Sequence, residues 1–378
     1  MELLVKPEHE SRWQACADAA AFGPVPFTRA WSGGQRYTHL SPLVLTAQEH
    51  ALLFEATAAL SGVFARVVEW VQRSPVILPV LGLPPEVEPW VVREPGAGPF
   101  SLLARFDWLR DVRGRWWCVE CNADTPGGLP EATVWQSLAS TPDLVNPNAD
   151  LAQVLGDALR RWLPGTAGFV GIPGYTEDWE NVLVAQGARG GASVAGGLPA
   201  VTPEGAVFVG GEPVDSLYRF YPGDWLFRHP DWLGALAAGL PCANPGRALI
   251  AQSKAFFALL WHLVDEGQFL TPAEREWVTT FLPRTSLAPL PGRWLAKPYW
   301  EREGWGITPG EGEGPAEPFC IYQERIEPVS LPFAGLSATP VVGVYAVEGR
   351  PAGYLTRLGG KITDRSAHMV PTFVAAPQ

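Results

Sequence analysis

A short stretch of the chain carries four polar side chains that can meet at one point: Arg105, Asp107, Glu120 and Asn122. Arg105 and Asp107 are two residues apart, and so are Glu120 and Asn122. Side chains two residues apart on a β-strand share a face. If the two strands pair through the polar turn at 111–115, two carboxylates and an amide oxygen converge. These are the hard oxygen donors that Mg²⁺ or Ca²⁺ prefers. The alternative is the solvated face of an antiparallel sheet.

The lysines are a second chemical signal. Among 28 basic residues, only Lys6, Lys254, Lys297 and Lys361 are lysine. Lys254 opens a predicted helix, and Lys297 ends a predicted strand. The loop at 301–306 follows, and its glycines let backbone N–H groups approach phosphate oxygens. The pattern is not a P-loop, because no Gly-Lys-Ser/Thr follows a strand. Read alone, the two lysines and the loop leave a nucleotide site of another kind as one hypothesis among several.

A rival interpretation comes from the CxxC sequence Cys118-Val-Glu-Cys121. In a redox or zinc site both sulfurs must reach one point. The apolar flanks predict a strand, in which positions i and i+3 point to opposite faces. No second Cys/His pair lies at zinc spacing, and the six scattered histidines do not indicate a hydrolase triad. We expect structural cysteines and keep a dithiol or metal-binding protein as the alternative.

The bulk properties indicate a globular chain. It has 378 residues, 47% hydrophobic and 18% charged, and its net charge of −11 argues against nucleic-acid binding. The N-terminus lacks the apolar region of a signal peptide, and prolines interrupt the most apolar stretch, 75–92, so no spanning helix is expected there. Five cysteines are few for this length and fit a reducing compartment. We expect a cytoplasmic protein without a membrane partner, and nothing in the sequence indicates an oligomeric state.

The elements that must position these residues are mixed. A capping box at Thr46–Glu49 and apolar residues at helical spacing predict a core helix over 46–71. Further helices are predicted at 131–139, 151–162, 177–188 and 253–264, and strands at 168–173, 206–209, 216–220, 293–297, 319–326, 341–347 and 354–357. Breaker clusters near 148 and 245 separate a small α/β unit, 149–244, from the rest.

Six separated motifs then occur in a recognisable order. They are Arg105-Phe-Asp107, Glu120-Cys-Asn-Ala-Asp-Thr-Pro126, Lys254-Ala-Phe-Phe-Ala-Leu-Leu-Trp261, Lys297-Pro298 with Arg302-Glu-Gly304, Tyr322-Gln323, and the run from Gly353 to Arg357 with Ile362-Thr-Asp364. Together they resemble the synthetase part of the glutathionylspermidine synthase family, from about residue 100 to the C-terminus. The resemblance implies an α/β fold of the ATP-grasp type. Its body would be 1–148 and 245–378, with 149–244 as a smaller pre-ATP-grasp-like domain. The amidase domain of some members is not expected.

The resemblance also implies an activity: an ADP-forming ligase that joins a small-molecule or peptide carboxylate to an amine through an acyl phosphate. The matched residues are Asp107, Glu120 and Asn122 for Mg²⁺, Arg105, Lys254, Lys297, Gln323 and Arg357 for ATP, and Arg302 with Arg105 for catalysis. The family's pattern is broken by Ser253, where Asn is usual, and by Glu301, where a small residue is usual.

Two questions stay open at this stage. Asp178 and Glu180 lie in an acidic stretch that resembles the segment relatives use near the polyamine, but acids also favour a helix N-terminus. The alternative to a ligase is an ATP-binding homologue that is inactive or acts as a phosphotransferase.

Overall fold

A six-stranded sheet forms the centre of this computed structural model, which describes residues 1–4, 10–32, 34–93, 96, 98–141, 143–333 and 336–376. The strand order is β22-β21-β20-β5-β6, with β19 paired to β20. The bounds are β5 (Leu103–Arg110), β6 (Trp116–Asn122), β19 (Leu331–Phe333), β20 (Leu336–Val347), β21 (Arg350–Gly359) and β22 (His368–Val370). Both predicted hairpins of this sheet, β5/β6 and β20/β21, are present.

The β5/β6 register places the polar side chains as the alternation predicted. Arg105 pairs with Asn122, and Asp107 pairs with Glu120. The register then shifts, because Trp108 pairs with Cys118 and leaves Val119 as an extra residue. Such a β-bulge breaks the alternation of faces locally.

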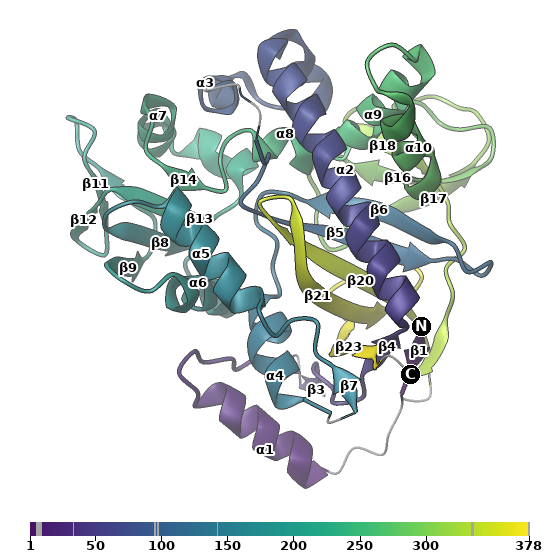
Figure 1. Cartoon of the computed structure of the whole chain (residues 1–378). Coiled ribbons are helices and arrows are strands. Elements are labelled where there is room, and N and C mark those ends of the chain that lie inside the picture. Colours follow the sequence, from purple (N-terminus) through teal and green to yellow (C-terminus); the bar gives the residue numbers. More distant parts are fainter. Residues whose placement is uncertain are drawn as a thin grey trace.

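The helix α2 (Ala47–Arg73) lies along one face of the central sheet (Figure 1). The predicted capping box is formed, since Thr46 and Glu49 bond reciprocally at its start. The predicted apolar stripe is buried, including Leu53, Leu60 and Val67 at 0% exposure. By length and composition α2 is the one helix of the described residues that could cross a membrane, but half of its most apolar window is buried inside the fold.

A second antiparallel sheet lies beside the central one. Its order is β15-β18-β16-β17, with bounds β15 (Thr285–Ser286), β16 (Arg293–Pro298), β17 (Thr308–Glu311) and β18 (Cys320–Glu324). Three helices precede it in the chain, α8 (Ala248–Gln252), α9 (Ala255–Glu266) and α10 (Pro272–Phe281). Lys254 is the residue directly before α9, as predicted.

A parallel sheet is built entirely from residues 167–243. Its order is β14-β13-β8-β9, with bounds β8 (Ala167–Gly171), β9 (Ser193–Gly196), β13 (Ser216–Phe220) and β14 (Cys242–Ala243). The nearby elements are α5 (Leu151–Trp162), α6 (Thr176–Arg189), α7 (Pro230–Ala238), β10 (Ala200–Val201), β11 (Val207–Val209) and β12 (Glu212–Val214). The boundaries at 148 and 245 stay a prediction.

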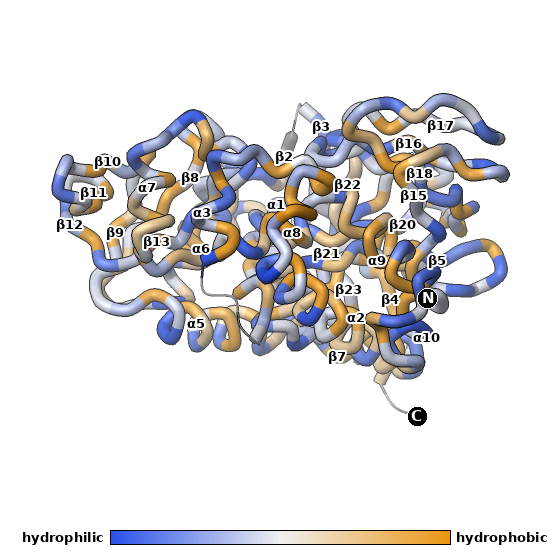
Figure 2. Tube along the Cα trace, turned by 90° about the horizontal axis from the view of Figure 1, so that it is seen from above, coloured by the Kyte–Doolittle hydropathy of each residue, from blue (hydrophilic) through white to orange (hydrophobic). Residues whose placement is uncertain are grey.

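The remaining α-helices and β-strands lie outside these three sheets. They are α1 (Glu10–Ala21), α3 (Glu88–Val91), α4 (Gln136–Leu138), β1 (Glu2–Leu3), β2 (Trp31–Ser32), β3 (Gln35–Arg36), β4 (Leu43–Leu45), β7 (Leu144–Val145) and β23 (Thr372–Ala375). Figure 2 shows from above that β10–β12 lie at one end of an elongated molecule and β15–β18 at the other. The central sheet therefore lies between two outer units.

Candidate functional site

A cavity of about 660 Å³ is lined by residues of all three parts of the fold. Asp107 comes from the central sheet, Lys297 from the second sheet, and Asp178 from the segment that carries the parallel sheet. This volume lies inside the range of about 300–1,000 Å³ that is usual for small-molecule sites.

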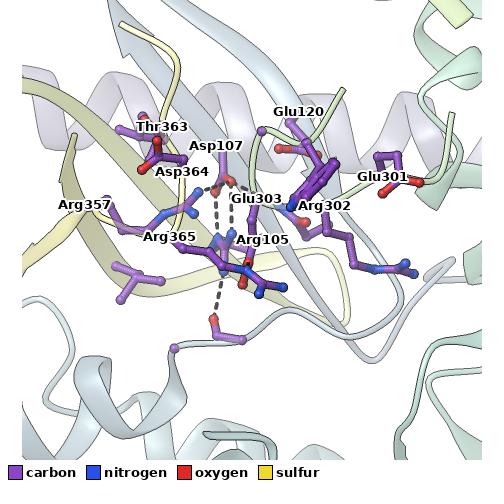
Figure 3. Close-up of a pocket in the computed structure, with 18 of the residues that line it drawn as sticks. Arg105, Asp107, Glu120, Glu301, Arg302, Glu303, Arg357, Thr363, Asp364 and Arg365 are labelled. Carbon is purple, nitrogen blue, oxygen red and sulfur yellow. Dashed lines mark hydrogen bonds and ion pairs between the residues drawn. The ribbon is translucent and has the colours of Figure 1, made fainter. Parts of the chain in front are cut away.

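Asp107 is the centre of the polar cluster. Arg105 donates to both of its carboxylate oxygens, at 2.6 and 3.0 Å. Arg357 and Asn122 each donate to Oδ2, at 3.1 Å. Figure 3 shows Arg105 and Arg357 pointing toward Asp107 from different directions. Burial alone would lower the pKa of Arg105, but Asp107 raises it above its ordinary value. Arg105 therefore stays charged, and the Arg357–Asp107 bond ties β21 to the β5/β6 hairpin.

Glu120 is held ionised by lysines from two distant segments. Lys254 Nζ lies 3.0 Å from Glu120 Oε1. Burial alone would raise the pKa of Glu120, but Lys254 and Lys297 lower it to about 2. Burial lowers the pKa of Lys297 to about 8, although Glu120 acts in the opposite direction. Lys254 is not one of the residues that line the cavity, but it forms an ion pair with Glu120, which is.

Gln323 lies beside Lys297 on the neighbouring strand. Its Oε1 accepts a 2.6 Å bond from Lys297 Nζ, and its Nε2 donates to Thr285 at 3.3 Å. The cavity wall around them is apolar and includes Leu295 and Ile326. A flat aromatic base with hydrogen-bonding edges suits such a wall.

The β-bulge corrects our argument about the CxxC sequence. Because Val119 is inserted, Cys118 lies opposite Trp108 and Cys121 opposite Phe106, two residues that share a face of β5. The two thiols therefore enter the same hydrophobic cluster, contrary to the predicted opposite faces. Burial raises both pKa values well above the ordinary value of cysteine. They are buried neutral thiols, the environment of structural cysteines.

The loop at 301–306, which we call the lid loop, borders the cavity. Arg302 pairs with Asp224 (Nη2–Oδ1, 2.5 Å), from the segment that carries the parallel sheet. Gly304 has φ +73°, and a Cβ there would come within 2.6 Å of the Thr363 carbonyl oxygen. Glu303 forms an ion pair with Arg365. The lid loop is thus packed against residues 361–367.

The two predicted substrate acids lie in different places. Asp178 lines the cavity, and burial with the neighbouring charge of Glu177 raises its pKa to about 7. Glu180 is buried away from the lining and accepts bonds from the backbone N–H and hydroxyl of Thr28, at 2.5 and 2.7 Å. Of the pair, Asp178 alone faces the cavity.

Arg29, Tyr37 and Glu131 also line this acidic end, and the sequence analysis missed them. Tyr37 donates a 2.9 Å hydrogen bond to Glu131 Oε1. Arg29 and Tyr37 lie in irregular chain before the central hairpin, where no spacing marks a site. Glu131 follows the Gly-Gly-Leu-Pro turn that comes after the matched motif Glu120–Pro126. Its closeness to that motif is the one sequence signal that could have identified it.

The donor set at the hairpin fits a magnesium ion. Mg²⁺ is commonly held by one or two carboxylates together with substrate phosphates, and Asp107 with Glu120 supplies two. Among the described residues no group of three or more His, Cys, Asp or Glu could hold a metal, so an amide and phosphate oxygens would have to complete the shell. Asn122 directs its amide nitrogen to Asp107 here, so its amide must rotate to offer oxygen. Gly343 leaves room, because a Cβ there would lie 2.9 Å from Asp107 Oδ1.

A cation-rich, carboxylate-bearing cavity lined by residues of two antiparallel sheets defines the class of protein. The fold is a mixed α/β fold of the ATP-grasp type found in synthetases. The chain belongs to the glutathionylspermidine synthase family: the family described as "Glutathionylspermidine synthase preATP-grasp" matches residues 6–375. Membership supports a ligase-type function in broad terms.

The comparison of structures supports the fold. A glutathione synthetase-like effector from Globodera pallida is similar with a TM-score of 0.63 over 96% of both chains, at 11% identity. A putative gamma-glutamylcysteine synthetase from Methylobacillus flagellatus KT is 12% identical over 87% of this chain and 88% of its own, but its TM-score of 0.43 is too low to bear on the fold. No curated protein matches the sequence.

Proposed function

We propose that this protein is an ATP-dependent, ADP-forming ligase that joins a carboxylate to an amine. The observation that carries the proposal is the cluster at the hairpin. Asp107 and Glu120 lie on paired strands, and Arg105, Arg357 and Lys254 surround them. Cations that already face two carboxylates can bind a polyphosphate together with its metal.

Each group of residues has a role in this reaction. Arg105, Arg357, Lys254 and Lys297 would bind the phosphates of ATP, and the wall around Gln323 would hold the adenine. Mg²⁺, held by Asp107, Glu120 and Asn122, would neutralise charge on the transferring phosphoryl group.

The chemical sequence follows from the bonds that must change. The substrate carboxylate attacks the terminal phosphorus of ATP, forming an acyl phosphate and releasing ADP. The amine, as its free base, then attacks the acyl carbon, which forms the amide and expels phosphate, and the proton lost from nitrogen leaves with the phosphate. Water would destroy the acyl phosphate, so the lid loop has to exclude it and bring Arg302 near the reacting centre. Release of Arg302 from Asp224 would accompany that closure.

The acidic end supports an amine as the second substrate. An ammonium group is attracted by carboxylates such as Asp178 and Glu131, which line the cavity there. The two substrates would then approach each other along the cavity, with the carboxylate held on the side of the phosphates.

The test is ADP release with a panel of carboxylates and amines in the presence of Mg²⁺. The proposal predicts release that needs both substrates and an amide product identified by mass spectrometry. Release with a carboxylate or hydroxyl compound alone, giving a stable phosphorylated product, would identify a phosphotransferase. ATP binding without release under any combination would identify an inactive homologue.

A further inference from the structure

The side chain of Arg302 points away from the polar cluster at the hairpin. Figure 3 shows it extending away from Asp107, toward which Arg105 points. Its Nη2 lies 2.5 Å from Asp224 Oδ1, and its Nη1 lies 3.4 Å from Asp224 Oδ2. Its guanidinium also lies 5.8 Å from the centroid of the Trp225 ring. Arginine binds carboxylates and phosphates with this bidentate geometry, so Asp224 occupies the donors that a substrate anion would use.

Asp224 is held in place by a buried network. The residue before it, Gly223, donates its backbone N–H to Asp124 Oδ2 at 2.8 Å. Asp124 is in turn paired with Arg219, and both of these side chains are fully buried. Asp124 follows β6 in the matched motif, so the network ties the turn at 222–225 to the hairpin. Of the pair between Arg302 and Asp224, the aspartate is therefore the fixed partner and the arginine the movable one.

The lid loop is held by contacts at each of its first four residues. Lys254 Nζ donates to the backbone carbonyl oxygen of Glu301 at 2.6 Å. The ion pairs of Arg302 and Glu303 and the packing of Gly304, described above, complete the set. Glu303 has φ +55°, a left-handed conformation that is uncommon in residues other than glycine. The loop therefore keeps its conformation through these contacts and not through local preference.

Asp224 differs from the other partners of the lid loop in its position. Lys254 also pairs with Glu120 of the proposed metal cluster, so a change of Lys254 would alter the site itself. Asp224 is not one of the described residues that line the cavity. Burial alone would lower the pKa of Arg302, but Asp224 raises it above its ordinary value. Removing the charge of Asp224 should therefore free a charged Arg302 without altering any group that binds the nucleotide.

We propose that Asp224 is a positioning residue that holds Arg302 outside the phosphate-binding cluster, and that the phosphates of the nucleotide displace Asp224 before the lid loop closes. The inference rests on the proposed ligase function for the identity of the nucleotide. It adds a control step to that reaction: Arg302 stays away from the reacting centre until the nucleotide is bound. Because binding has to break the ion pair, the observed affinity is lower than the affinity of the closed state.

The test measures binding of the β,γ-imido analogue of ATP with Mg²⁺ to the full chain by calorimetry. In Asp224→Asn the ion pair is lost, so the analogue should bind about three- to tenfold tighter. Hydrogen exchange of the backbone amides at 301–306, followed by mass spectrometry, should be faster in the free variant than in free wild type. With the analogue bound, the two proteins should exchange at the same rate. Asp224→Glu keeps the charge and should stay closer to wild type in both readouts.

A matched control is Asp265→Asn. Asp265 accepts the same bidentate pairing from Arg284, at 2.5 and 2.8 Å, and Arg284 also lies over a tryptophan ring, 4.7 Å from the Trp261 centroid. Neither Asp265 nor Arg284 is among the described residues that line the cavity. The control should leave the affinity and the exchange unchanged. If Asp224→Asn does not fold, Arg302→Gln breaks the same pair from the side of the lid loop and should give the same faster exchange in the free protein.

The outcomes separate this inference from the ligase proposal. Weaker or unchanged binding in Asp224→Asn, unchanged exchange at 301–306, or no binding of the analogue to wild type would each overturn it. A merely structural role of Asp224 would weaken binding and would not tighten it. If the variant binds the analogue tighter but no carboxylate and amine release ADP from ATP, the ligase proposal fails and the role of Asp224 remains. If wild type forms the amide and the variant binds no tighter, the ligase proposal remains and the role of Asp224 fails.

Discussion

Replacing Glu120 by Gln removes one carboxylate while keeping the size of the side chain. If Glu120 binds Mg²⁺, ADP release should fall at least about 100-fold, because loss even of groups that support a metal ligand typically costs 10–100-fold. The Mg²⁺ concentration that gives half-maximal release should also rise. Arg105 and Asp107 are untouched, so the nucleotide should still bind.

The same change has a calculable effect on stability. Lys254 and Lys297 lower the pKa of Glu120 from 4.5 to about 2. That shift corresponds to at most about 3 kcal/mol of stabilisation by the ionised form. Because the folded-state pKa is depressed, this stabilisation is present above the ordinary pKa near 4.5 and is lost as the pH falls toward 2. Glu120→Gln should therefore lower the free energy of unfolding at pH 7 and make little difference near pH 2.

ADP release is measured with a coupled enzyme assay over a range of Mg²⁺ concentrations. The free energy of unfolding is measured in urea at neutral and at acidic pH. Glu276→Gln, an exposed position on α10, is the control and should leave both readouts unchanged. A Glu120→Gln variant with full activity and an unchanged Mg²⁺ requirement would refute the metal assignment. A variant as stable as wild type at pH 7 would refute the electrostatic argument.

Three further outcomes are expected. Replacing Cys118 and Cys121 by Ala should keep ADP release within about twofold and cost about 1 kcal/mol of unfolding free energy each; loss of a bound metal ion would instead revive the CxxC site. Since the pKa of Lys297 is lowered to about 8, its positive charge is present below that pH, so the KM for ATP should rise as the pH increases through 8, and a flat profile to pH 9.5 would contradict its role. Arg219→Met leaves the fully buried Asp124 without its ion-pair partner and should lower the unfolding free energy by about 3–5 kcal/mol in urea; recovery of part of this loss by Asp124→Asn in the same chain distinguishes the buried charge from lost packing.

Much of the candidate site was accessible from the sequence because it depends on local rules. Strand alternation placed Arg105 with Asp107 and Glu120 with Asn122, and the polar turn between the strands brought the pairs together. The capping box before α2 and the helix after Lys254 also depend only on residues close together in the sequence. The alternation rule then failed at Val119, because a bulge depends on how β6 meets its partner strand and not on its own pattern.

The acidic end shows where local rules stop. Asp178 and Glu180 are two residues apart in one acidic stretch, yet one faces the cavity and the other holds the loop at Thr28. Arg29 reaches Glu131 and Glu177 across more than 100 residues of sequence. Such contacts are set by the packing of distant segments, which no spacing records.

The sequence by itself determined which chemical groups the protein could use. The carboxylates, lysines and arginines of the matched motifs, and the strands and helices that carry them, follow from residue type and periodicity. Only the tertiary structure decided how these groups are charged and paired. Glu120 is ionised because Lys254 and Lys297, from other elements, lie close to it. Arg302 forms an ion pair with Asp224, which belongs to another part of the fold. The physical reason is that burial and charge–charge energies depend on distances in space, and the chain's order does not contain those distances.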